Sequence, residues 1–147
     1  QNLALVSDAG TPLISDPGYK LVRECISQNL PVDSLPGPSS VITALTLSGL
    51  PPDKFMFLGY LPEKPIRRSK VLKELSSDIT YIIFVAPHKL LRTIESFKEV
   101  FGDINITLAH ELTKIHQSVS SKPVSEWLKT FKSPKGEYIL LFRLASA

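Results

Sequence analysis

Short apolar runs alternate along the chain with stretches in which apolar residues recur every three or four positions. Such runs are typical of strands, and the helical spacing is typical of amphipathic helices. The pattern predicts strands at residues 3–7, 32–35, 54–59, 79–85, 104–110 and 137–143, and helices at residues 17–28, 65–76, 88–101 and 122–132, with one more helix that ends near residue 48. Strands interleaved with helices indicate an α/β fold.

A change of composition at residues 49–53, Gly-Leu-Pro-Pro-Asp, marks a boundary between two parts of the chain. The alternation of strands and helices restarts after it, so we predict two α/β domains, residues 1–50 and 51–147. The first domain opens directly on an apolar run at residues 3–6, which is typical of a buried parallel strand. We therefore expect further strands of this domain to precede Gln1, so that the first domain is incomplete in this chain.

Two loops of the first domain, residues 7–11 and 36–40, each follow a predicted parallel strand. Open α/β sheets usually bind ligands at the C-terminal ends of their strands. The loops are rich in small residues, so their backbone groups can approach a ligand closely. The pattern predicts a small-molecule cleft, although ordinary turn and cap chemistry explains each residue taken alone. The hydrogen-bonding side chains of these loops are Asp8, Thr11, Ser39 and Ser40.

Composition narrows the class of protein. The chain has 147 residues, 43% of them hydrophobic, and its apolar runs are far shorter than the roughly 20 residues of a membrane-spanning helix. Cys25 is the single cysteine, and the residues after Gln1 lack the pattern of a signal peptide. These features predict a cytoplasmic protein that does not span a membrane. A net charge of +3 and a pI near 9.0 are compatible with a nucleic-acid partner without requiring one.

Several reaction classes lack their sequence motifs. The chain has neither Gly-x-x-x-x-Gly-Lys-Ser/Thr nor Gly-x-Gly-x-x-Gly, so we expect no nucleoside-triphosphate site and no classical dinucleotide site. There is no Gly-x-Ser-x-Gly elbow, and Cys25 lies on the apolar side of a predicted helix. His110 and His116 have the wrong spacing for zinc on a helix, because position 114 is lysine. We therefore expect neither covalent catalysis nor a metal site.

Basic residues gather in two clusters of the predicted second domain. Either cluster is compatible with contacts to a phosphate backbone, and also with an ordinary solvated helix face. The sequence pattern alone leaves both readings open. The larger cluster contains Lys64, Arg67, Arg68, Lys70 and Lys73, and the smaller contains Lys89 and Arg92.

Five motifs in a fixed order point to a family. They are Ser7-Asp8-Ala9-Gly10-Thr11-Pro12-Leu13-Ile14-Ser15-Asp16-Pro17-Gly18, Pro36-Gly37-Pro38-Ser39-Ser40, Gly59-Tyr60-Leu61-Pro62, Pro87-His88-Lys89-Leu90 and Glu111-Leu112-Thr113-Lys114. The series runs over essentially the whole chain and resembles the tetrapyrrole-methylase superfamily. Within it, the chain is most similar to the bacterial branch that methylates the ribose 2′-hydroxyl of a cytidine in small-subunit ribosomal RNA.

The resemblance implies two α/β domains with S-adenosylmethionine bound in the cleft between them. A contact from the second domain to this cofactor is implied at Val85 or Ala86. The family usually has glutamate at the position of Val85, so this chain lacks a hydrogen-bond acceptor there. The contacts implied in the first domain fall in the two loops already described, at Asp8, Ala9, Gly10, Thr11, Ser39 and Ser40.

The reaction that the resemblance implies is methyl transfer to a ribose oxygen. It requires in-line positioning of the reactants and removal of the hydroxyl proton by a base within reach. Glu111 and His116 are available for this step, but we hypothesise that Lys114 or His88 is the base.

The resemblance also implies a partner, which is ribosomal RNA or the small ribosomal subunit. Arg67, Arg68 and Lys89 are the residues expected to contact its phosphates. Because members of the superfamily often form homodimers, we expect a homodimer here. Two alternatives stay open: an enzyme of the superfamily that methylates a tetrapyrrole or another small molecule, and a non-catalytic binding protein with the same fold.

Overall fold

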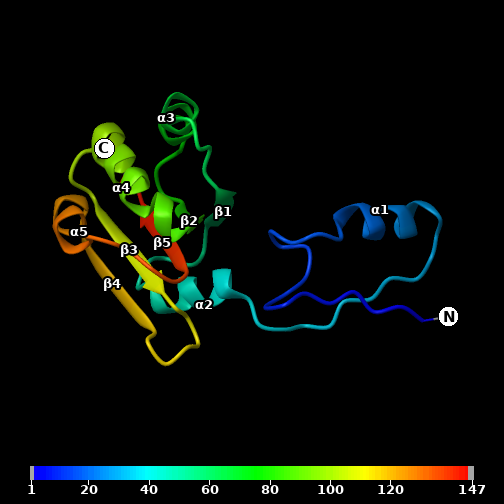
Figure 1. Cartoon of the computed structure of the whole chain (residues 1–147). Coiled ribbons are helices and arrows are strands. Elements are labelled where there is room, and N and C mark those ends of the chain that lie inside the picture. Colours follow the sequence, from blue (N-terminus) through cyan, green and yellow to red (C-terminus); the bar gives the residue numbers. More distant parts are fainter. Residues whose placement is uncertain (1, 146–147) are drawn as a thin grey trace. The chain divides into compact units, whose positions relative to one another are not determined.

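The computed structural model of the chain describes residues 2–145 (Figure 1). Its backbone divides into two compact units, Gln1–Ser40 and Val41–Ala147. In the described part of the chain, the first unit contains the helix α1 (Tyr19–Ser27), and all five strands belong to the second unit. The two domains predicted from the sequence, residues 1–50 and 51–147, stay a prediction.

The prediction of two strands in the first unit is wrong. Residues 3–7 and 32–35 take part in no strand pairing, and Leu3 and Leu35 are 91% and 86% exposed. A strand is stabilised by hydrogen bonds to a neighbouring strand, and no segment within residues 2–40 pairs with these runs. The helix expected at residues 17–28 is confirmed as α1, which begins directly after Gly18.

The second unit is built on one five-stranded sheet in the order β1-β2-β5-β3-β4. β1 is parallel to β2, and the other neighbouring pairs are antiparallel. This mixed sheet with its helices confirms the α/β class. The strands are β1 (Phe55–Tyr60), β2 (Thr80–Val85), β3 (Asn105–His110), β4 (Ser118–Pro123) and β5 (Tyr138–Arg143).

Four predicted helices occur in the second unit, each with shorter bounds. No helix in residues 2–145 has the length and apolar character required to cross a membrane. The strand β4 was not expected, because its polar sequence Ser-Val-Ser-Ser-Lys-Pro has almost no apolar alternation. The helices are α2 (Ser40–Leu47), α3 (Pro65–Lys73), α4 (Leu90–Phe101) and α5 (Val124–Thr130), with a short 3₁₀ turn, η1 (Pro87–Lys89), before α4.

Side chains of β2 alternate between two cores, as the two-residue period of a strand requires. Tyr81 and Ile83 face a core that they share with α3, α4 and α5, through residues such as Leu72 and Phe97. Ile82 faces the opposite core, where α2 packs through Val41, Ala44 and Leu45. Within the second unit, the sheet therefore lies between α2 on one face and three helices on the other (Figure 1).

Candidate active site

The strand register places a row of residues across one end of the sheet. Val85 of β2 pairs with Tyr138 of β5. Tyr138 also pairs with His110 of β3, which pairs with Ser118 of β4. β1 runs parallel to β2, and its last residue, Tyr60, pairs one position before Val85. The C-terminal ends of β1, β2 and β3 therefore lie at the same end of the sheet.

Three of the five sequence motifs meet at this end. Residues 59–62 close β1, residues 87–90 follow β2, and residues 111–114 follow β3. The motifs are far apart in sequence, and the register brings them to one edge of the unit. We call this region the motif end of the sheet and treat it as the candidate active site of the second unit.

Lys114 lies in the β3–β4 loop between two carboxylates. Its Nζ atom is 3.0 Å from Glu111 Oε1 and 2.9 Å from Glu137 Oε2. Hydrogen bonds to Glu137 and then to Glu111 raise the pKa of Lys114 above its ordinary value of 10.5. The pKa of the Glu111 carboxyl lies below 4.5, first because the Glu137 backbone N–H donates to it and second because of Lys114. At neutral pH, Lys114 is therefore a protonated ammonium group whose position is fixed by the two carboxylates.

A tight approach between two loops supports this arrangement. A Cβ atom at Gly136 would lie 2.7 Å from both Glu111 Oε1 and His110 Nε2, and Gly136 has a φ of 83°. His110 Nε2 donates to the carbonyl of Lys135 at 2.9 Å, and its ring stacks on Tyr138 at 4.4 Å between centroids. Glycine at position 136 thus allows the β5 turn to approach the β3–β4 loop.

Glu137, Gly136 and Tyr138 were missed by the sequence analysis. They stand at the start of a predicted strand and carry no motif of their own. Burial raises the pKa of the Tyr138 phenol above 10.0, and its ring is packed in the core. The turn sequence Ser-Pro-Lys-Gly before β5 was the one available signal, and it indicated a turn without indicating what the turn contacts.

His88 and Lys89 lie on η1, directly after β2. His88 is exposed. Lys89 forms an ion pair with Glu63 of the β1–α3 loop, and this contact lowers the pKa of the Glu63 carboxyl, with a smaller contribution from His88. The pair joins the loops that follow β1 and β2, so it connects two of the three motifs.

The implied cofactor contacts of the second unit have different surroundings. Val85 is 5% exposed and packs in the core beneath α4, so its side chain is a core residue. Ala86 is half-buried and stands at the N-terminus of η1, where its carbonyl accepts a hydrogen bond from Lys89 N–H at 2.9 Å. The hydrogen-bond acceptor that glutamate would provide at position 85 is replaced here by apolar packing.

Arg67 and Arg68 are neighbours in α3 with opposite environments. Arg67 is exposed. Arg68 is 7% exposed, and its Nε donates to Ser96 Oγ of α4 at 2.8 Å. Its Nη1 donates to the carbonyls of Pro62 at 3.3 Å and Glu63 at 3.0 Å. Arg68 therefore joins α3, α4 and the β1–α3 loop, and its guanidinium group is occupied by these internal contacts.

In the first unit, the two loops that the sequence pattern paired do meet. Thr11 Oγ1 donates to the Pro38 carbonyl at 3.0 Å. Ser7 Oγ donates to the carbonyls of Ala9 at 3.3 Å and Gly10 at 3.2 Å. Gly10 has a φ of 74°, a conformation that favours glycine. Asp8 and Ala9 are exposed, Ser39 is half-buried, and Ser40 is the first residue of α2.

The sequence of this chain is similar to those of known proteins. It matches the family Tetrapyrrole (Corrin/Porphyrin) Methylases over residues 1–127. It is 44% identical over 146 residues to the Ribosomal RNA small subunit methyltransferase I of Hydrogenobaculum sp. (strain Y04AAS1), covering 96% of this chain and 63% of that protein. It is 46% identical over 142 residues to the protein of the same name from Rickettsia prowazekii (strain Madrid E), covering 95% and 51%. The chain thus spans about half to three fifths of the length of these relatives.

The fold also occurs in solved structures. Uroporphyrin-III C-methyl transferase from Thermus thermophilus, complexed with S-adenyl homocysteine, matches with a TM-score of 0.57 and 13% identity, over 90% of this chain and 62% of that one. Identity at this level bears on the fold alone. The family match, in contrast, covers most of the sequence, and the chain therefore belongs to the tetrapyrrole (corrin/porphyrin) methylase family.

Proposed function

We propose that this chain acts in S-adenosylmethionine-dependent methyl transfer to the ribose 2′-hydroxyl of a cytidine in small-subunit ribosomal RNA. The observation that carries the proposal is the meeting of three motifs of that branch at one end of one sheet. The identity of 44% to 46% with relatives named as methyltransferases of this RNA supports it. We further propose the family's two-domain arrangement, with residues 1–50 in the first domain and residues 51–147 in the second.

Two features of the loops in the first unit support a role in cofactor binding. Small residues at 9–10 leave the backbone accessible, and the Thr11–Pro38 hydrogen bond holds the two loops together. S-adenosylmethionine supplies an electrophilic methyl group on a sulfonium centre when it is bound. We assign its binding to both loops, with Ala86 as a contact from the second unit through the backbone. For Val85 the assignment is also limited to backbone groups, because its side chain lies in the core. The cofactor loops contribute Asp8, Ala9, Gly10, Thr11, Ser39 and Ser40.

The surroundings of the two candidate bases, Lys114 and His88, favour one of them. A general base must accept a proton, and the carboxylates of Glu111 and Glu137 hold Lys114 in its protonated form. We therefore assign proton removal from the ribose hydroxyl to His88, whose imidazole is exposed at the motif end of the sheet. Lys114 then provides a fixed positive charge there, suited to orienting a phosphate.

Contacts to the RNA are assigned to Arg67 and Lys89, which have exposed or partly exposed side chains. Arg68 is not assigned to the RNA, because its guanidinium is buried and hydrogen-bonded within the unit. The partner that we propose is ribosomal RNA, free or within the small ribosomal subunit. A homodimer and a cytoplasmic location belong to the same proposal.

Two measurements test this function. The first is calorimetric titration of S-adenosylmethionine into the full chain, for which we expect saturable binding. The second is methyl transfer to small ribosomal subunits that lack the modification, for wild type, His88→Ala and the matched control His116→Ala. Loss of a general base is expected to lower the rate by about 10²- to 10⁴-fold. The absence of cofactor binding would overturn the cofactor assignment, and equal rates for His88→Ala and His116→Ala would overturn the assigned base.

A further inference from the structure

Positive charge is concentrated in a single segment of the chain. Residues 63–74 contain five cationic side chains and two anionic ones, Glu63 and Glu74, which gives a local charge of +3. The whole chain has 17 cationic and 14 anionic side chains, a net charge of +3. The remaining residues therefore balance at 12 of each sign, and the excess charge of the protein lies on α3 and its flanks.

The structure separates these five cations into one inner residue and four outer ones. Arg68 points inward, where its bonds to Ser96 and to the carbonyls of Pro62 and Glu63 fix α3 against its neighbours. Leu72, one turn further along the same helix face, is fully buried in the core. These contacts determine how the helix is rotated, and the opposite face is turned to solvent. The sides of α3 that are turned to solvent contain Arg67, Lys70 and Lys73, and Lys64 is the N-cap residue just before the helix; all four are exposed. We call these four residues the outer face of α3.

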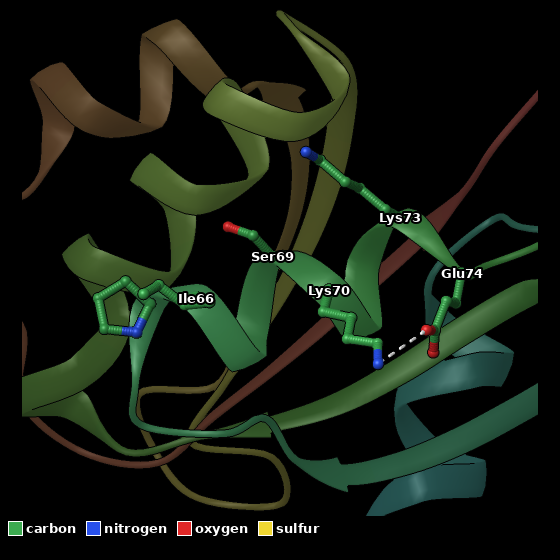
Figure 2. Close-up of a pocket in the computed structure, with 6 residues that line it drawn as sticks. Ile66, Ser69, Lys70, Lys73 and Glu74 are labelled. Atoms are coloured by element: carbon green, nitrogen blue, oxygen red, sulfur yellow. Dashed lines mark ion pairs between the residues drawn. The ribbon is translucent and has the colours of Figure 1, made fainter.

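The outer cations are largely uncompensated. Within residues 2–145, Lys64, Arg67 and Lys73 have no acidic group within ion-pair distance. Lys70 is 4.0 Å from Glu74, and both side chains are mostly exposed, so this pair is weak. In the close-up, Lys70 reaches toward Glu74 while Lys73 extends away from that pair (Figure 2). A shallow open groove runs along the same helix and is lined by Pro65, Ile66, Ser69, Lys70, Lys73 and Glu74.

The position of α3 connects this face to the candidate active site. β1 ends at the motif end of the sheet, and α3 follows it after a short loop at residues 61–64. Lys64 therefore stands nearest to the motifs, and the other outer cations follow at intervals of three residues. The rise of an α-helix places Lys73 about 14 Å further along the axis than Lys64.

We propose that the outer face of α3, formed by Lys64, Arg67, Lys70 and Lys73, is a phosphate-binding track for the RNA substrate, beginning at the motif end of the sheet. A row of uncompensated cations over this length matches the repeated negative charge of an RNA backbone. Ile66, which is 86% exposed, and its exposed neighbour Pro65 are two apolar side chains among these cations, too little for a protein interface, whose core is depleted of charge. The contacts position the RNA without reading its sequence.

This inference rests on the proposed function, because it presumes an RNA substrate. It is tested in the full chain by replacing all four residues: Lys64→Gln, Arg67→Gln, Lys70→Gln and Lys73→Gln. The matched control replaces four exposed lysines elsewhere, Lys54, Lys98, Lys129 and Lys132, with glutamine. Both variants lose the same charge, so they differ only in where it was removed. Circular dichroism and the fluorescence of Trp127 confirm that each variant is folded.

The probe is a short fluorescein-labelled single-stranded RNA, and its dissociation constant is measured by anisotropy across a range of salt concentrations. Four phosphate contacts correspond to a slope of about −3 in log affinity against log salt, or about a 50-fold loss between 50 and 200 mM. We expect the α3 variant to lose most of this slope and to bind about tenfold or more weakly at low salt. The control variant is expected to retain the slope of wild type.

Equal weakening in both variants would overturn the inference, since net charge alone would then explain binding. Unchanged RNA affinity in the α3 variant would overturn it as well. So would a change of self-association, measured by sedimentation, in that variant and in Ile66→Ser without a change in RNA affinity, because the face would then be a protein interface. These outcomes are distinct from a failure of the proposed function, which is read from cofactor binding and methyl transfer.

Discussion

The two units of this chain differ in their family motifs and in their buried side chains. The first unit contains the twelve-residue motif at 7–18, the longest of the family motifs. Yet every buried side chain in the described residues lies between Val41 and Phe142, in the second unit. The first unit is held by hydrogen bonds such as that from Thr11 to Pro38, whereas the second is held by two apolar cores. The residues that best identify a family are therefore not the ones that stabilise its fold.

The largest expected effect comes from emptying a core position in the second unit. Phe97 is fully buried and contacts Phe142 edge-to-face at 4.7 Å between ring centroids. We expect Phe97→Ala to lower the free energy of unfolding by about 3–5 kcal/mol, through lost burial and the cavity left behind. Urea unfolding followed by the fluorescence of Trp127, the only tryptophan, reports on this unit.

Leu35→Ala is the matched control in the first unit. Leu35 is 86% exposed, and substitutions at such positions usually change stability by less than about 0.5 kcal/mol. The unfolding of this variant is followed by circular dichroism, because that signal includes the helix α1 of the first unit. A loss of stability comparable to that of Phe97→Ala would mean that the first unit has a core of its own, and the comparison between the units would be wrong.

The next effect in size concerns the turn before β5. An added Cβ at position 136 meets the carboxylate of Glu111 and the ring of His110, and both are anchored by hydrogen bonds. Gly136→Ala therefore combines the cost of a left-handed backbone, about 1–2 kcal/mol, with displacement of these anchors. Gly49 also has a positive φ, 72°, but open space around it, so Gly49→Ala measures the backbone cost alone. A urea midpoint for Gly136→Ala equal to that of Gly49→Ala would show that the close approach adds nothing.

The sequence pattern predicted the second unit better than the first for a physical reason. In the second unit, periodic apolar residues coincide with faces that are covered, so α4 and β2 were found at nearly their observed bounds. The apolar runs at 3–7 and 32–35 have the same appearance, but no strand pairs with them. β4 was missed for the opposite reason, because this polar edge strand is held by backbone pairing to β3. Apolar pattern predicts burial, and pairing requires a partner that the pattern does not specify.

The candidate site shows the same limit at the level of single residues. The five motifs were read directly from the sequence, but the register that joins three of them depends on tertiary pairing. Arg67 and Arg68 look identical in sequence, and the rotation of α3 makes one exposed and the other internal. Glu137 was missed because its role depends on the loop that it faces. Residue type indicates chemistry, and packing decides whether that chemistry is available.

A smaller effect is expected in the first unit, on binding instead of stability. Thr11→Val removes the hydroxyl that donates to the Pro38 carbonyl. One hydrogen bond contributes about 0.5–1.5 kcal/mol, so we expect S-adenosylmethionine to bind about 2- to 10-fold more weakly by calorimetry, with unchanged unfolding of the second unit. Thr46→Val is the control, because Thr46 Oγ1 donates to the Thr43 carbonyl within α2. If both variants bound the cofactor more weakly to the same extent, the hydrogen bond between Thr11 and Pro38 would have no specific effect on cofactor binding.

The smallest effect is a dependence on pH that arises from the motif end of the sheet. The pKa of Glu111 is depressed in the folded chain, so its contribution to stability is present above its ordinary pKa of 4.5 and is lost as pH falls through the folded value. The pKa of Lys114 is raised, so its contribution is present below 10.5 and is lost as pH rises through the folded value. Stability from this network is therefore expected to be constant at neutral pH and to decline toward both extremes.

Glu111→Gln separates this network from the rest of the molecule. The variant removes both the depressed carboxyl and one partner of Lys114, so the acid decline of its urea midpoint, followed by Trp127 fluorescence, should be shallower than that of wild type. Glu95→Gln changes the same charge at an exposed position of α4 and should leave the decline as it is. If both variants flatten the curve equally, overall charge governs the acid response. If only Glu111→Gln does, the β3–β4 loop is an electrostatically fixed part of the second unit, in contrast to the loops of the first.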